Sequence, residues 1–329
     1  MKVTVIGGSG HIGSFLVPRL VRAGHDVTNI SRGTSKPYTE APEEWQQVHH
    51  VTADRQAEDQ DGTFPDRVAA LKPDAVVDLV CFTLDSAISL VQRLRGEVGH
   101  LLHCGSVWRY GQSLKLPIRE GSDSAAAPFG EYGIQKNRIA LMLKEETARG
   151  GLATTSLHPG HIVGPGWHPI GPLGNLDPHV WQTISAGQPL RVPGSGAELM
   201  HHVHADDVAQ AFEKAIARRD AATGEDFNIV APTALTVRGY ADIAAAWFGH
   251  AAVLETVSWE RFGEDTSREF AESSWGHLYR SQCFSIDKAA TALGYAPRYE
   301  PEQAILESIQ WLVEHEQLHV ARALGVPAG

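Results

Sequence analysis

Residues 2–16 read KVTVIGGSGHIGSFL, and this stretch decides the fold. The β-branched residues of 3–6 predict a short buried strand, and the apolar residues after the glycines recur with helical spacing. The intervening Gly7, Gly10 and Gly13 have a first gap one residue wider than the G-x-G-x-x-G fingerprint of dinucleotide-binding proteins. Such glycines let the backbone approach a pyrophosphate, and the first amides of the helix attract its negative charge. We therefore predict a phosphate cradle here in preference to a structural glycine turn.

A β-α-β unit follows from this start, because DVTNIS over 26–31 predicts a second strand. Strand-like and helical runs continue to alternate through the first half of the chain. The predicted strands cover 74–82, 100–106 and 153–159, and the predicted helices cover about 86–95 and 132–149. This alternation is typical of an α/β protein with right-handed crossovers. We predict a Rossmann-like, doubly wound parallel sheet with a smaller C-terminal substrate-binding region.

The composition changes after the last of these strands. Residues 164–196 are rich in glycine and proline, which predicts loops of a second region built over the sheet. A predicted helix over 206–219 and a strand over 226–230 return the chain to the sheet. We therefore predict a cofactor-binding domain over 1–164, joined by the returning segment 200–231. The smaller domain is predicted over 165–199 and 232–329, with helices at about 236–248 and 301–316.

The overall composition is that of an ordinary globular protein. Of the 329 residues, 43% are hydrophobic and 20% are charged. The formal net charge of −11 argues against a nucleic-acid partner, which would require clustered lysine and arginine. No apolar stretch is long enough to span a membrane, and a strand that starts at residue 2 leaves no room for a signal peptide. We predict a cytoplasmic protein with neither a membrane nor a nucleic-acid partner.

A second motif, EYGIQKN over 131–137, carries the chemistry. Tyr132 and Lys136 are four residues apart, so a helix places both on one face. A phenol has a reference pKa of about 10, and a neighbouring ammonium lowers it by favouring the phenolate. Such a pair can exchange a proton with a substrate hydroxyl or carbonyl while a nicotinamide exchanges hydride. An exposed helical pair is the alternative if this motif stands alone.

Ser106 supports the catalytic interpretation. It lies just past a buried strand, at the carboxyl edge where open parallel sheets bind ligands. A hydroxyl there can hydrogen-bond the reacting oxygen and orient it for the tyrosine. A serine that only caps a turn is the alternative.

Together these motifs resemble the extended short-chain dehydrogenase/reductases, specifically their NAD-dependent epimerase/dehydratase group. The resemblance covers nearly the whole chain. It implies a Rossmann domain, a bound nicotinamide cofactor, and Ser106 and Tyr132 as catalytic hydroxyls, with Lys136 holding the ribose and tuning Tyr132. The motifs that carry it are the glycines of 7–13, GSVWRYG (105–111), YGIQK (132–136), HPGHIVGPG (158–166), HVHADDVAQAF (202–212) and LGYAPRYEPEQAILESIQWL (293–312). The expected cofactor-binding residues are Gly7, Gly10, His11, Ile12, Gly13, Ser31, Arg32, Asp54, Tyr132, Lys136 and Pro159.

Two departures from the family pattern concern the cofactor and the reaction. NAD users of this family usually have an aspartate at the end of the second strand, where this chain has Ser31 and Arg32. A guanidinium in place of a carboxylate suits a 2′-phosphate, so we predict NADP, with NAD as the alternative if Arg32 only stacks on adenine. The sugar 4,6-dehydratases have an acidic pair after the serine, whereas this chain has Val107 and Trp108. We therefore expect no dehydratase activity.

A third departure concerns the substrate. Family members that bind nucleotide diphospho-sugars commonly have arginines where this chain has Met200 and His158. The missing cations favour an uncharged or monocarboxylate polyol, sugar or similar alcohol. Trp108, Trp167 or Trp275 could stack on a sugar face. His201, His202 and His204 do not match a known metal pattern, and we predict no metal site.

The predicted function is hydride transfer at a carbinol or carbonyl carbon of a carbohydrate-like substrate, by an NAD(P)-dependent epimerase or dehydrogenase with Tyr132 as general acid/base. A nucleotide-sugar epimerase is one alternative. A non-catalytic cofactor-sensing or RNA-associated protein on the same fold is another. The helices at 86–95 and 134–147 have more apolar surface than one stripe against the sheet requires, which predicts a homodimer.

Overall fold

The computed structural model describes residues 1–121 and 125–325. Its centre is a seven-stranded parallel sheet in the order β11-β6-β5-β4-β1-β2-β3. The order reverses between β4 and β1, and this switch point is where doubly wound sheets bind ligands. The predicted Rossmann-like fold is confirmed. The strands are β1 (Lys2–Ile6), β2 (Asp26–Ser31), β3 (His49–Thr52), β4 (Ala75–Asp78), β5 (His100–Cys104), β6 (Thr154–Pro159) and β11 (Asp226–Ile229).

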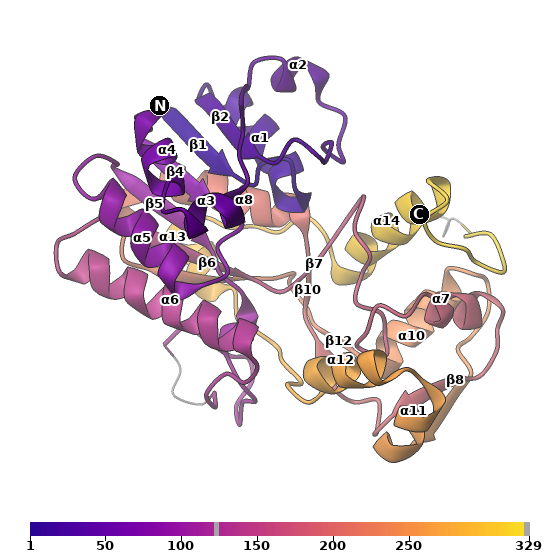
Figure 1. Ribbon diagram of the computed structural model, residues 1–329. Helices are drawn as coiled ribbons and strands as arrows, with labels where there is room; N and C mark the ends of the chain where they lie inside the picture. Colours follow the sequence, from indigo (N-terminus) through magenta and orange to yellow (C-terminus); the bar gives the residue numbers. More distant parts are fainter. Residues whose placement is uncertain (122–124, 326–329) are drawn as a thin grey trace.

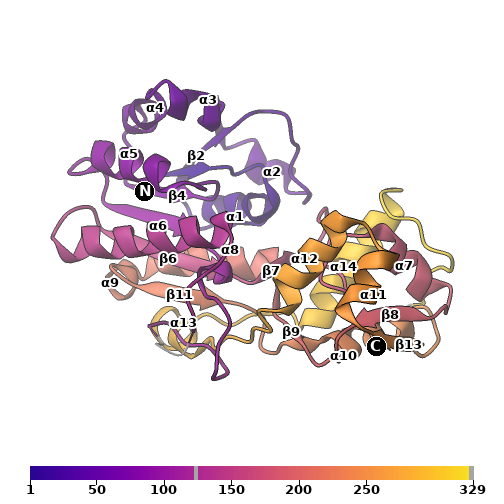
Figure 2. The ribbon, with the colours of Figure 1, turned by 60° about the horizontal axis from the view of Figure 1, so that its bottom comes forward.

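Helices cover both faces of the sheet (Figures 1 and 2). One face packs against α1 (His11–Arg22), α8 (Ala205–Ala217) and α13 (Asp287–Leu293), and α9 (Arg219–Ala222) follows α8. The other face packs against α4 (Phe64–Ala70), α5 (Leu84–Leu94) and α6 (Glu131–Ala148). Two short helices, α2 (Pro42–Trp45) and α3 (Arg55–Gln60), and the 3-10 turn η1 (Val107–Arg109) lie in the connections.

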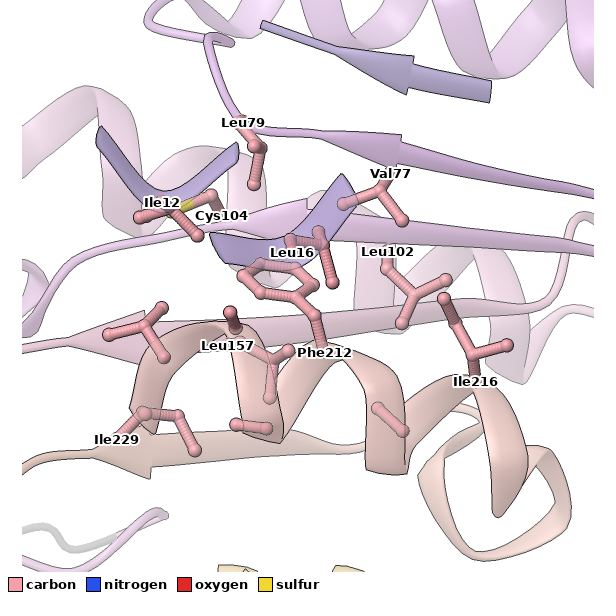
Figure 3. Packing of buried hydrophobic residues seen from close by; sticks show 14 of the residues in the cluster. Ile12, Leu16, Val77, Leu79, Leu102, Cys104, Leu157, Phe212, Ile216 and Ile229 are labelled. Carbon is pink, nitrogen blue, oxygen red and sulfur yellow. The ribbon is translucent and has the colours of Figure 1, made fainter. Parts of the chain in front are cut away.

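The alternation of side chains in β1 shows why both faces need helices. Val3 and Val5 join the core beneath α1 and α8, whereas Ile6 joins the core beneath α4, α5 and α6. Figure 3 shows Phe212 of α8 lying against Leu16 of α1 and over the sheet. Phe212 is fully buried, and such burial contributes about 1.5–3 kcal/mol of stability.

The smaller region has a core of its own and lies beside the Rossmann part (Figures 1 and 2). Tyr240, Trp181 and Phe248 are among its buried residues. β7 (His161–Val163) and β10 (His202–His204) lie where the chain passes between the two parts, and they pair in parallel. Its helices are α7 (Pro178–Ser185), α10 (Val237–Ala246), α11 (Trp259–Asp265), α12 (Arg268–Leu278) and α14 (Pro301–Glu314). Its strand pairs are β8 (Leu190–Pro193) with β13 (Leu254–Val257), and β9 (Leu199–Met200) with β12 (Leu235–Thr236).

One segment differs from the predicted division of the chain. The sequence prediction assigns all of 232–329 to the smaller region, but Ala289, Leu293 and Tyr295 are buried in the core beneath α1 and α8. The physical reason is that α13 covers β11 and the end of α8, which would otherwise expose apolar surface. The last four residues of the predicted region lie outside the described residues. Among the helices that the structure describes, none is long and apolar enough to cross a membrane.

Candidate active site at the carboxyl edge of the sheet

The glycine motif forms a tight turn between β1 and α1. Gly7 has a φ of +86°, and a Cβ there would lie 2.6 Å from Cγ1 of Val80. A Cβ on Gly13 would lie 2.3 Å from the carbonyl oxygen of Gly8, so only glycine lets the helix pack this closely on the turn. Gly10 starts α1 without a side-chain cap. The backbone therefore presents the helix N-terminus in a form suited to a phosphate group.

A cavity of about 870 Å³ extends from this turn along the carboxyl ends of β1, β2 and β4. Its size falls in the range of small-molecule sites. Five of the predicted cofactor-binding residues line it, namely Gly7, Gly10, Ser31, Arg32 and Asp54. The glycine turn, the uncapped helix and this cavity fit an extended dinucleotide.

The predicted catalytic residues also lie at this edge of the sheet. Ser106 lies two residues after the end of β5, and its Oγ accepts a hydrogen bond from the Trp108 amide at 3.2 Å. Tyr132 lies in the first turn of α6 and remains 42% exposed. Lys136 is buried, and its Nζ lies 5.8 Å from the centroid of the Tyr132 ring. The structure therefore brings two hydroxyls and an ammonium together near the ends of β4 and β5.

A family comparison agrees with this arrangement. The family model described as "NAD dependent epimerase/dehydratase family" matches residues 3–230. The chain belongs to this family. It is therefore an NAD-dependent enzyme of the short-chain dehydrogenase/reductase type.

Individual relatives carry different activities. The chain is 26% identical over 318 residues to the chloroplast stem-loop binding protein of 41 kDa b from Arabidopsis thaliana, covering 93% of this chain and 78% of that protein. It is 32% identical over 219 residues to 2′-dehydrokanamycin reductase from Streptomyces kanamyceticus, covering 66% of this chain and 58% of that protein. The UDP-glucose 4-epimerase of Thermotoga maritima, solved with UDP-glucose, has a similar fold, with a TM-score of 0.71 and 19% identity over 96% of this chain and all of that chain.

The Lys136 ammonium is bound to two backbone carbonyls in this structure. Its Nζ donates hydrogen bonds to the carbonyls of Cys81 at 2.8 Å and Cys104 at 2.7 Å. Desolvation by the surrounding protein raises the pKa of Tyr132 to about 12, and a hydrogen bond with Ser106 opposes this rise. In this structure the ammonium is directed at two carbonyls, and the lowering of the Tyr132 pKa by Lys136 stays a prediction. Below pH 12 the phenol is mostly protonated and can donate a proton.

Arg55 is a cavity residue that the sequence motifs do not identify. Its guanidinium is buried and hydrogen-bonds Ser86 Oγ at 2.9 Å. It also forms ion pairs with Asp78 and, at 3.3 Å, with Asp59. Although burial opposes the charge, these carboxylates hold the pKa of Arg55 above its ordinary value. Asp54 beside it caps α3 by accepting hydrogen bonds from the second and third amides of the helix, those of Gln56 and Ala57.

A buried ionic network lies behind Ser106. His158 packs so closely on Gly105 that a Cβ there would lie 2.1 Å from its Nδ1. Arg109, three residues after Ser106, approaches His158 Nε2 at 2.8 Å and forms an ion pair with Asp226. His158 occupies a position where the family resemblance expects an arginine. Burial lowers the pKa of His158, so its ring is neutral, and the guanidinium in this network comes from Arg109. The network ties the turn after β5 to β11.

The remaining predicted residues are not among those that line the cavity. His11 is buried, and its ring stacks on Trp167 with a centroid distance of 4.9 Å. Met200 is buried in the smaller region. Ile12 is in the core, Gly13 lies in the first turn of α1, and Pro159 ends β6.

The three histidines near β10 have separate hydrogen-bond partners. His201 Nε2 lies 2.9 Å from the Ala231 carbonyl. His202 Nε2 lies 3.2 Å from the Ile170 carbonyl. His204 Nε2 lies 3.1 Å from Glu307. Within the described ranges, no three metal-ligating side chains form a group that could hold an ion.

Proposed function

We propose that this chain transfers hydride between a nicotinamide cofactor and a carbinol or carbonyl carbon of a sugar, sugar acid or similar polyol. The observation that carries the proposal is the meeting of Tyr132, Ser106 and Lys136 at the sheet edge, next to a cavity that fits a dinucleotide. The bound nicotinamide supplies or accepts the hydride. Ser106 hydrogen-bonds the reacting oxygen, and Tyr132 gives that oxygen its proton in the reduction and removes it in the oxidation.

We propose NADP as the preferred cofactor. Arg32 lines the cavity directly after β2, where a 2′-phosphate of the adenosine ribose would lie by analogy with other dinucleotide folds. Ser31 adds a hydroxyl at the same edge, and its Oγ lies 3.3 Å from Ser9 Oγ and accepts from the Gly33 amide at 3.3 Å. Arg55, the other arginine lining the cavity, is already paired with Asp78 and Asp59, which leaves Arg32 as the charged group suited to a phosphate.

A nucleotide-sugar epimerase is the second candidate, favoured by the fold shared with the UDP-glucose 4-epimerase of Thermotoga maritima. The buried Met200 and the neutral His158 speak against a diphosphate-binding pair of cations. A purely binding function, suggested by the name of the Arabidopsis relative, needs no phenol beside a serine and a buried lysine.

The test is a turnover screen of free sugars, sugar acids and nucleotide-sugars with NAD and with NADP. A dehydrogenase or reductase changes the absorbance of reduced nicotinamide, whereas an epimerase interconverts two sugars without a net change. Turnover that depends on Tyr132 supports the proposal. A complete absence of turnover, with retained cofactor binding, favours the binding protein.

A further inference from the structure

Arg280, just after α12, is a buried guanidinium that forms no ion pair with an acidic group among the described residues. Only 2% of the residue is exposed. Nη2 donates to the Phe129 carbonyl at 3.0 Å, Nη1 donates to the Gly276 carbonyl, and Nε is buried without a partner. Burial alone lowers its pKa to about 10, and in the described part of the chain no carboxylate opposes that effect.

The other well-buried arginines provide a contrast. Arg19 pairs with Asp206, Arg55 with Asp78 and Arg109 with Asp226. Proteins rarely bury a charge without pairing it, because the lost hydration is costly. Arg280 is therefore a charge that still lacks its counter-ion.

The Trp108 ring contacts both the Arg280 guanidinium and the Tyr132 ring. The guanidinium carbon is 3.9 Å from the centroid of the Trp108 ring and 3.7 Å from that of Phe129. The Trp108 ring in turn lies 6.0 Å from the ring of Tyr132. Stacking on two rings stabilises a guanidinium but does not neutralise it.

Imidazoles with unused hydrogen-bonding atoms extend the same cluster. The His277 ring lies 4.8 Å from Trp108 and 5.1 Å from His161, and His161 lies 5.3 Å from His202. Both ring nitrogens of His161 and Nδ1 of His202 are buried without a partner. A neutral imidazole always carries one N–H donor, and a buried donor without an acceptor is rare in native proteins.

We propose that Arg280, His161 and His277 form a subsite beside Tyr132 that takes a carboxylate of the substrate. The inference rests on the proposed function and narrows its substrate class to sugar acids and related hydroxy acids. A carboxylate accepts hydrogen bonds from a guanidinium and from imidazole N–H groups at once. Trp108 is only half-buried, and it is the side chain that the ligand displaces to reach the guanidinium.

The count of cations favours a carboxylate over a diphosphate. Arg280 is a single positive charge, and the neighbouring histidines are neutral because burial holds their pKa values below the ordinary range. Met200 supplies no second cation. One guanidinium matches one carboxylate, whereas a nucleotide diphosphate carries at least two negative charges.

The test compares matched ligands by calorimetry on the NADP-loaded protein. D-glucuronate and D-galacturonate are titrated against the neutral D-glucose and D-galactose, with acetate as a small probe and UDP-glucose as the phosphate probe. We expect at least one uronate to bind about tenfold or more tightly than its neutral partner. We expect Arg280→Gln to remove this preference and Arg280→Lys to restore part of it.

Arg268→Gln is the matched control, because Arg268 lies on the same α12, is exposed and pairs with Glu272. It should leave the uronate preference unchanged. His161→Phe keeps a ring in place but removes the nitrogens, so it should also weaken uronate binding. It takes the place of Arg280→Gln as the test if that variant is too unstable to measure. Tyr132→Phe should keep the preference while losing turnover, which separates this subsite from the proposed reaction.

The other outcomes overturn the assignment. If neither uronate binds more tightly than its neutral partner and acetate does not bind, the cluster takes no carboxylate. If UDP-glucose binds in an Arg280-dependent way while the uronates gain nothing, the cluster takes a phosphate instead. A uronate preference that survives in both Arg280→Gln and His161→Phe places the anion elsewhere.

Discussion

Replacing Tyr132 by phenylalanine removes one hydroxyl and leaves the packing of the ring intact. The ring contacts Trp108 and Phe82 at centroid distances of 6.0 and 6.5 Å, and both contacts survive the change. We therefore expect little loss of folding stability. Without the proton donor, kcat should fall by about a hundredfold or more, which corresponds to about 2.7 kcal/mol of lost transition-state stabilisation. Cofactor affinity should stay near wild type, because Tyr132 does not line the dinucleotide cavity.

The assay is steady-state turnover followed by nicotinamide absorbance, with cofactor affinity measured separately by fluorescence titration. Tyr279→Phe is the matched control, since Tyr279 is exposed to a similar extent but stacks on Trp275 instead of lying beside Lys136. It should keep most of the activity. A Tyr132→Phe variant with full activity would refute the assignment of Tyr132 as the proton-transfer group.

The pKa of Tyr132 also predicts how the two directions of the reaction depend on pH. With a pKa of about 12, the phenol stays protonated across the neutral range, so carbonyl reduction should be flat between pH 6 and 9. Carbinol oxidation needs the phenolate, whose population is roughly one in ten thousand at pH 8 and rises about tenfold per pH unit. An oxidation rate that reaches its plateau below pH 9 would show that the pKa is lower in the working enzyme.

Four further outcomes follow from the structure. Arg32→Ala should weaken NADP binding much more than NAD binding in parallel titrations, and equal losses would show that Arg32 reads no phosphate. Gly13→Ala should lower the melting temperature and cofactor affinity because its Cβ meets the Gly8 backbone at 2.3 Å, whereas Gly263→Ala, a helical site with open space, should do neither. Asp226→Asn should cost about 3 kcal/mol or more in denaturant unfolding, since it leaves the buried Arg109 charge without its carboxylate partner. Because the folded-state pKa of Asp226 is lowered, wild type should lose that contribution as the pH falls below about 4, and the difference from the variant should shrink there. Light scattering should return a homodimer that Leu141→Glu disrupts, since Leu141 is 54% exposed on α6, and a wild-type mass of 35.7 kDa would contradict the dimer.

The parts of the fold that depend on local pattern could be predicted from the sequence. The β-branched run before Gly7 and the helical spacing after Gly13 are sufficient for β1, the turn and α1. Regular alternation of strands and helices then indicates a parallel sheet. By contrast, α13 has only seven residues, and its place beneath α8 depends on apolar surface elsewhere in the chain that a short pattern does not reveal.

In the candidate site, too, the local sequence pattern predicts some features, whereas others depend on distant parts of the chain. A spacing of four places Tyr132 and Lys136 on one helical face, but it does not show where the ammonium points. That direction depends on the carbonyls of Cys81 and Cys104, which only the folded sheet brings under α6. Arg55 was missed for a similar reason, since its partners Asp78 and Ser86 come from other elements.

The residue proposed for substrate selection comes from a more distant part of the chain than those proposed for hydride transfer. Ser106 lies in the turn after β5 and Tyr132 in the first turn of α6, both in the Rossmann part. Arg280 follows α12 of the smaller region. Arg280 nevertheless donates to the Phe129 carbonyl, just before α6 begins, and stacks on Trp108, just after Ser106. A ligand that binds the Arg280 guanidinium is therefore next to the two segments that carry Ser106 and Tyr132. In such an arrangement a change of substrate class needs changes only in the smaller region, while the segments that carry Ser106 and Tyr132 stay as they are.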